Sequence, residues 1–270
     1  MDTSTTEKTN QPQHYHFEFF GKGSEYFSIM IINWVLTLFT LGLYYPWARA
    51  KRLQYVHSQT ALNNERFYFS GTGKEMFKGF IKILLFYFVV MSIYVLLATT
   101  AQMPILAILV LYLAIFAIIP FAIHGSFRYR MSRTSYRGIR FGYRGDRNEL
   151  VKNFFKWVLL TIATLGIYGA WLQMNLRKYT HQNIRYGDVE FSNNADGGDW
   201  FVLNLKGYFL TIFTIGIYAF WWQRDIFNYY IDNMIMTKGD QKIKCYSTAT
   251  GGGFFTLLMV NLLIIVFTLG

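Results

Sequence analysis

The chain has 270 residues, of which 53% are hydrophobic, 20% aromatic and only 15% charged. An ordinary soluble domain carries about 25% charged residues, and here the apolar residues form long charge-free blocks, which excludes a disordered chain and favours a membrane protein. The net charge of +11 would suit a nucleic-acid-binding protein. However, the basic residues lie beside blocks of spanning length, so we expect them to face anionic lipid and no nucleic acid.

The chain opens with a polar tail, residues 1–25, that lacks the features of a cleavable signal peptide. Six apolar blocks of about spanning length follow, and all are uncharged except for Lys82 near the start of the second: 26–47, 81–100, 104–123, 157–176, 207–223 and 251–270. The second and third blocks are separated only by "AQM", which predicts a transmembrane helical hairpin. The sequence therefore predicts a mainly α, multi-spanning membrane protein with internal repeats and short β or turn elements in its loops.

One phrase recurs in the other blocks. It reads "LTLFTLGLYYPW" at 36–47, "LTIATLGIYGAW" at 160–171 and "LTIFTIGIYAFW" at 210–221, and it begins again as "IIVFTLG" at 264–270. Each complete copy is followed by a polar helix-like stretch, a short alternating run and a turn, which indicates one supersecondary unit used several times. A fourth phrase cut at Gly270 predicts a fragment of a longer protein.

The predicted division of the chain follows these repeats. It comprises a tail (1–25), repeat 1 (26–78), the hairpin with a degenerate repeat tail (79–155), repeat 2 (156–199), repeat 3 (200–252) and the start of a truncated repeat 4 (253–270).

Loop charges distinguish two topologies. Segments 48–78 and 126–150 carry net charges of +4 and +5, whereas 172–199 carries −1 and the first 25 residues carry −2. Six spans with the N-terminus outside would obey the positive-inside rule at each loop. The alternative is that the glycine-containing copies are re-entrant or interfacial, which would give like repeats the same orientation. We expect spanning, and the re-entrant alternative stays open.

The phrase supplies the first candidate site. Its threonines recur three residues apart, so that both hydroxyls fall on one helix face. They either bond to carbonyls of the preceding turn and pack against a neighbour, or converge with freed carbonyls on a polar path, as broken helices do in transporters. The residues are Thr37, Thr40, Gly42, Thr161, Thr164, Gly166, Thr211, Thr214 and Gly216.

Basic residues supply the second candidate site. Arginines recur between aromatic residues in 127–147, a pattern that either anchors topology or binds lipid headgroups. The candidate lipid-binding or anchor residues are Arg49, Lys51, Arg52, Arg128, Arg130, Arg133, Arg137 and Arg140. No catalytic constellation, cofactor motif or metal-ligand cluster is evident, so we predict neither an enzyme nor a bound cofactor or metal.

The segment "YFSIMIINWVLTLFTLGLYYPWARAKRLQYVHSQTALNNERFYFSGTG" resembles the YjgN-like family of bacterial inner-membrane proteins, whose function is unknown. The resemblance covers nearly the whole chain, and it implies a multi-pass protein of the Gram-negative inner membrane. The second and third copies read "WLQ" and "WWQ" where the first reads "WAR".

Two functions stay open. One is transport or lipid handling through the repeated threonine–glycine segment. The other is a structural or assembly role in which a basic cytoplasmic face binds anionic lipid or a partner protein. The residues decide neither the oligomeric state nor a substrate.

Overall fold

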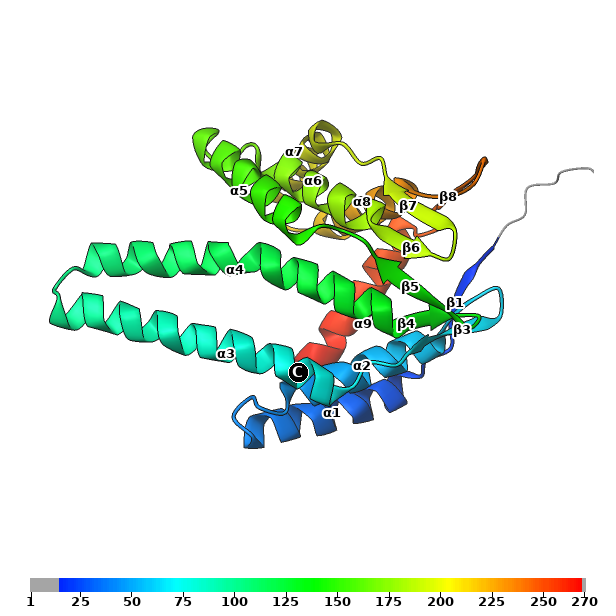
Figure 1. Ribbon diagram of the computed structural model, residues 1–270. Helices are drawn as coiled ribbons and strands as arrows, with labels where there is room; N and C mark the ends of the chain where they lie inside the picture. Colours follow the sequence, from blue (N-terminus) through cyan, green and yellow to red (C-terminus); the bar gives the residue numbers. More distant parts are fainter. Residues whose placement is uncertain (1–14, 269–270) are drawn as a thin grey trace, which may run out of the picture. The chain divides into compact units, whose positions relative to one another are not determined.

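The computed structural model describes residues 15–268, which form helical hairpins alternating with short antiparallel strands (Figure 1). The described residues divide into two compact units: one contains residues 15–89 and 133–139, and the other contains residues 90–132 and 140–268. The predictions for residues 1–14 of the tail and for residues 269–270 lie outside the described part of the chain.

The first unit begins with strand β1 (Phe17–Phe19) and the helices α1 (Gly23–Phe39) and α2 (Tyr45–Gln59). Strands β2 (Thr60–Leu62) and β3 (Glu65–Phe69) follow, then helix α3 (Gly73–Val95), and β4 (Thr134–Tyr136) returns to this unit. The strands pair antiparallel in the order β1–β2–β3–β4. Ala61 on β2, Phe69 on β3 and Tyr136 on β4 are buried, so the core of this unit includes side chains of its sheet.

The second unit begins at Val90, in the last part of α3. A π-helical turn, Leu96–Thr100, and the loop Ala101–Met103 lead into α4 (Pro104–Arg133). Strand β5 (Ile139–Tyr143), helices α5 (Arg147–Ala163) and α6 (Gly169–Gln182), and strands β6 (Ile184–Tyr186) and β7 (Val189–Asn193) follow.

The same order then recurs. Helices α7 (Gly197–Phe213) and α8 (Ala219–Asp232) precede strands β8 (Met234–Lys238) and β9 (Gln241–Lys244), and α9 (Gly251–Thr268) completes the described chain. Strands β5 to β9 pair antiparallel in chain order. Buried Met174, Ala195 and Trp200 form the centre of this unit's core.

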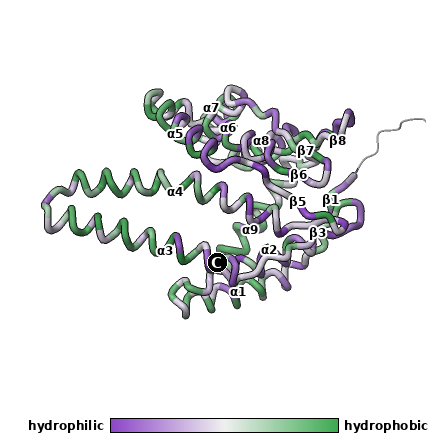
Figure 2. Tube along the Cα trace, in the orientation of Figure 1, coloured by the Kyte–Doolittle hydropathy of each residue, from purple (hydrophilic) through white to green (hydrophobic). Residues whose placement is uncertain are grey.

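Within residues 15–268, two helical segments are long and apolar enough to cross a membrane: Gly73–Thr100 and Pro104–Arg133. These are the segments that "AQM" separates, and the predicted turn and the helix start at Pro104 are confirmed. Figure 2 shows α4 coloured hydrophobic along most of its length, with hydrophilic residues gathered toward its C-terminal end.

The six-span prediction is not confirmed, because no single helix runs through a complete copy of the repeated phrase. Residues 26–47, 157–176 and 207–223 are each divided into two helices by a turn at the phrase. The break has a backbone cause, since two successive residues in each turn adopt left-handed conformations: Leu41–Gly42, Leu165–Gly166 and Ile215–Gly216. A right-handed helix cannot continue through such residues.

Each pair of helices folds back on itself. The Tyr55 hydroxyl near the end of α2 contacts Lys22 at the start of α1, while Asn33 in mid-α1 bonds to Ala48 in α2. Tyr179 and Tyr229 make the corresponding contacts to Asp146 and Asp196. Thus α1–α2, α5–α6 and α7–α8 are antiparallel helical hairpins with the phrase at their tips, and Figure 1 shows the paired helices side by side.

Candidate functional site: three threonine–glycine turns

The turn at each hairpin tip bonds its own backbone. In the first copy, Gly42 N–H donates to the Thr37 carbonyl at 2.7 Å, and Leu43 N–H donates to the Thr40 carbonyl at 3.0 Å. The Tyr44 N–H donates to the Thr40 hydroxyl at 3.0 Å, and that hydroxyl donates to the Leu36 carbonyl at 2.7 Å. Every backbone N–H from Thr40 to Tyr45 therefore has an acceptor inside the turn.

The other two turns use the same bonds. Gly166 N–H donates to Thr161 O at 2.7 Å and Gly216 N–H to Thr211 O at 2.8 Å. The hydroxyls of Thr164 and Thr214 accept from the Tyr168 and Tyr218 N–H groups at 3.0 and 2.9 Å. The order Thr-x-x-Thr-x-Gly-x-Tyr thus encodes one helix-reversing turn, in which the second threonine replaces a missing backbone acceptor.

In two of the three phrases, the first threonine also donates a hydrogen bond to a carbonyl of its own helix. Thr37 donates to Asn33 O at 2.6 Å, and Thr161 donates to Trp157 O at 2.8 Å. This is the back-bonding that threonine makes within helices. Thr211 differs, because its buried hydroxyl has no hydrogen-bond partner within the described residues.

The side chains at the hairpin tips are apolar and highly exposed. Leu41, Leu165 and Ile215 are 94%, 95% and 95% exposed, although large aliphatic side chains are normally buried. Phe39 and Phe213, which end the first helix of their hairpins, are also largely exposed. A shallow hollow of about 240 Å³, lined by Thr214, Ile217, Tyr218 and Trp221, lies at the third tip.

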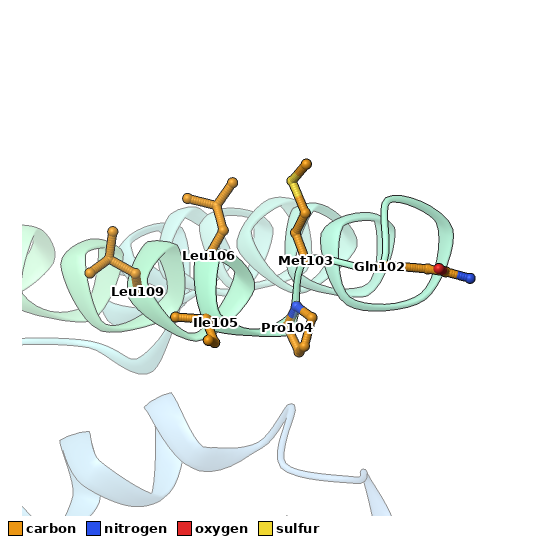
Figure 3. A pocket seen from close by; sticks show the side chains of 6 residues that line it. All are labelled: Gln102, Met103, Pro104, Ile105, Leu106 and Leu109. Carbon is orange, nitrogen blue, oxygen red and sulfur yellow. The ribbon is translucent and has the colours of Figure 1, made fainter.

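Another apolar hollow, of about 450 Å³, lies at the turn before α4. Figure 3 shows Gln102 at the tip of this turn, with Met103, Pro104, Ile105, Leu106 and Leu109 behind it. Its lining is almost wholly apolar, and no metal-binding cluster of His, Cys, Asp or Glu occurs within residues 15–268.

Tyrosines close the base of each hairpin, which the sequence reasoning missed. The Tyr179 hydroxyl donates to Asp146 O at 2.7 Å and contacts Glu149 at 3.1 Å, and the Tyr229 hydroxyl donates to Asp196 O at 2.8 Å. Burial, together with the Glu149 carboxylate, raises the pKa of Tyr179 and keeps the donor protonated. The signal was present: each closing tyrosine follows the tyrosine of its phrase by the same interval, as in Tyr168 and Tyr179.

Each phrase's tryptophan also has a fixed neighbour. The indoles of Trp47, Trp171 and Trp221 lie where a Cβ atom would stand on Gly73, Gly197 and Gly251, the first residues of the following helices. The tryptophans therefore pack against helix starts. Only glycine leaves them room.

The candidate basic residues are dispersed. Lys51 and Arg52 are exposed on α2, where Lys51 lies over the Tyr44 ring at 5.9 Å. Arg133 forms an ion pair with Glu75. The remaining ones are Arg49 on α2, Arg128 and Arg130 on α4, Arg137 in the turn after β4, and Arg140 on β5. Arg49, Lys51 and Arg52 thus share α2, while Arg128, Arg130 and Arg133 share α4.

The fold defines a class: an α-helical protein with two long apolar helices, recurring helical hairpins and antiparallel strands. The family model described as "Bacterial protein of unknown function (DUF898)" matches residues 14–207, so the chain belongs to this family. The resemblance to YjgN-like proteins is thereby confirmed.

Similar curated proteins bear the name "Inner membrane protein YjgN". That of Escherichia coli K12 is 32% identical over 158 residues, which are 58% of this chain and 37% of the relative. That of Salmonella typhimurium LT2 is 34% identical over 160 residues, 59% of this chain and 39% of the relative. The matched region thus spans less than two fifths of these relatives' length. No solved structure matches.

Proposed function

We propose that the protein resides in the bacterial inner membrane, where it binds and organises lipid and acts neither as an enzyme nor as a channel for polar solutes. The location is supported by the names of the relatives and by the two apolar helices of spanning length. The observation that carries the functional part is the internal bonding of the threonine–glycine turns.

A polar path needs groups that are free to replace water around a solute. Five of the six phrase threonines donate to a carbonyl of their own helix. The glycine-containing turns, in addition, satisfy their own N–H groups. What these turns present outward is aliphatic and aromatic surface, which suits acyl chains.

Charge supports the same proposal. Residues 83–127 contain no Asp, Glu, Lys or Arg, and their one histidine, His124, lies four residues before Arg128 at the charged end of α4. Ion-coupled pathways, by contrast, usually place ionisable groups within the bilayer. The exposed side chains of Lys51 and Arg52 lie close to the first apolar tip. From a position beside a tip that enters the membrane, a basic side chain can extend along the helix and reach lipid phosphates.

The experiment compares two double variants of the full chain in nanodiscs. Lys51→Gln/Arg52→Gln removes two charges beside a hairpin tip, and Lys242→Gln/Lys244→Gln removes two from β9. Retention of phosphatidylglycerol over phosphatidylcholine is measured by native mass spectrometry. We expect weaker retention, by up to about 30-fold, only for the α2 variant, since each of its two basic residues near the surface contributes about 1 kcal/mol.

Equal retention by both variants would refute headgroup binding at α2. Saturable uptake of a polar solute by proteoliposomes of the unchanged chain would favour the transport alternative. A structural role that depends on a partner protein predicts unchanged lipid retention together with loss of a co-purifying partner.

A further inference from the structure

Each hairpin can enter the hydrocarbon core of a bilayer only as far as the charged residues on its two helices allow. In α5–α6 the uncharged arms are residues 157–163 and 169–176, bounded by Lys156 and Arg177. At 1.5 Å per helical residue these arms are roughly 10 and 12 Å long. The hydrocarbon core is about 30 Å thick, so one leaflet offers about 15 Å.

The α7–α8 hairpin has the same limits. Its uncharged arms are residues 207–213 and 219–223, bounded by Lys206 and Arg224, and they are roughly 10 and 8 Å long. Block lengths of about 20 residues thus correspond to two short arms rather than to one span.

The α1–α2 hairpin is asymmetric but also too short. Its first arm, residues 26–39, is roughly 21 Å long, and its second, residues 45–48, is roughly 6 Å long before Arg49. A full crossing would bury Arg49 and its neighbours Lys51 and Arg52 in hydrocarbon, where each charge costs about 3 kcal/mol.

The turns have the chemistry that lipid requires. Irregular backbone is excluded from hydrocarbon unless its polar groups are satisfied, and these turns satisfy every N–H from Thr40 to Tyr45 and at the corresponding positions of the other copies. In water, solvent could satisfy these N–H groups, and exposing Leu41, Leu165 and Ile215 to it would be unfavourable. The bonding and the exposure are independent observations, and both point to acyl chains.

We infer that α1–α2, α5–α6 and α7–α8 are re-entrant hairpins. Each inserts its tip among the acyl chains of one leaflet and returns to the side it came from. Because each hairpin returns, and α3 and α4 cross as a pair, β1 and all the strand pairs lie on one side of the membrane. This inference uses the proposed membrane location, but it is independent of the proposed lipid-binding role.

The distribution of basic residues indicates on which side of the membrane the strands lie. All 26 lysines and arginines lie outside residues 83–127, and the loop Ala101–Met103 that faces the opposite side has none. Basic residues gather on the cytoplasmic side. The strands therefore face the cytoplasm, and the −1 segment 172–199, which the six-span topology places outside, is cytoplasmic.

Cysteine accessibility in intact bacteria separates this topology from six spans. With Cys245 replaced by serine, single cysteines are introduced as Ala101→Cys, Asn64→Cys, Glu18→Cys and Asn194→Cys in the full chain, all at exposed positions. Both topologies place residue 101 outside and residue 64 inside, which provides the controls. Only the six-span topology places residues 18 and 194 outside.

A membrane-impermeant maleimide is expected to label Ala101→Cys in intact cells, and the other three only after permeabilisation. Labelling of Asn194→Cys or Glu18→Cys in intact cells would overturn the inference, as would failure to label Ala101→Cys from outside. Either result leaves the lipid-retention test unaffected. Recovery of the chain in the soluble fraction would instead refute the membrane location on which both proposals rest.

Discussion

The contact between each phrase's tryptophan and the next helix start allows a graded test of the fold. A methyl group at Gly197 would overlap both the indole and the Cα atom of Trp171, and Gly73 has the same relation to Trp47. Gly251 would meet only the indole ring of Trp221. Since a side chain can shift where backbone cannot, Gly73→Ala and Gly197→Ala should cost more than Gly251→Ala.

The magnitude follows from overpacking. Forcing one methyl into a filled site costs about 1–3 kcal/mol, and the backbone contacts at Gly73 and Gly197 place them at the upper end of that range. Gly252→Ala is the matched control, because a Cβ at this neighbouring position meets nothing within 4 Å. Replacing an unhindered helical glycine with alanine gains up to about 1 kcal/mol.

The assay is thermal unfolding of the purified chain in nanodiscs. At about 2–4 °C per kcal/mol for a chain of this size class, Gly197→Ala should lower the midpoint by several degrees and Gly252→Ala should leave it unchanged or raise it slightly. Equal midpoints for these two variants would refute the tryptophan packing. Equal losses at positions 197 and 251 would refute the argument from backbone contact.

Three further outcomes are expected. Thr164→Val should destabilise the chain by about 1–3 kcal/mol because it leaves the Tyr168 N–H without an acceptor, while Thr164→Ser should retain near-native stability in the same melting assay. Gly216→Ala should cost about 1–2 kcal/mol because φ is +90° there, although the space around it is open; an unchanged midpoint would contradict the left-handed turn. Burial lowers the pKa of His181 below its ordinary 6.5, so the unfolded state binds more protons than the folded state below about pH 6.5, and the stability of the fold should decrease with acidification. In melts from pH 8 to pH 5, His181→Asn should flatten this pH dependence. An equally steep decrease in the variant would exclude His181 as its source.

Sequence patterns predicted the local elements well but not the path of the chain. Charge-free length identified the helix pair separated by "AQM", and alternation identified runs such as 66–71 that form β3. The same length criterion failed to predict the turn within the phrase, because hydropathy carries no information about backbone conformation. The sequence reasoning treated residues 26–47 as one block, whereas Leu41 and Gly42 together reverse the helix.

The candidate site was found without its role. The recurrence of Thr37, Thr40 and Gly42 singled out the phrase, but which atoms the hydroxyls bond depends on the turn that the glycine permits. The closing tyrosines were missed because Tyr179 and Asp146 are 33 residues apart. Their pairing follows only once α5 and α6 are known to be antiparallel.

The depth of the hairpin tips tests the central claim most directly. A fluorophore is attached at Leu165→Cys, in a chain with Cys245 replaced by serine, and is quenched by lipids that carry spin labels at defined acyl positions. The re-entrant hairpin predicts strongest quenching by labels within the near leaflet, roughly 10–12 Å beyond the flanking charges, and protection from aqueous iodide. Quenching by iodide, or by headgroup labels of the far leaflet, would contradict it.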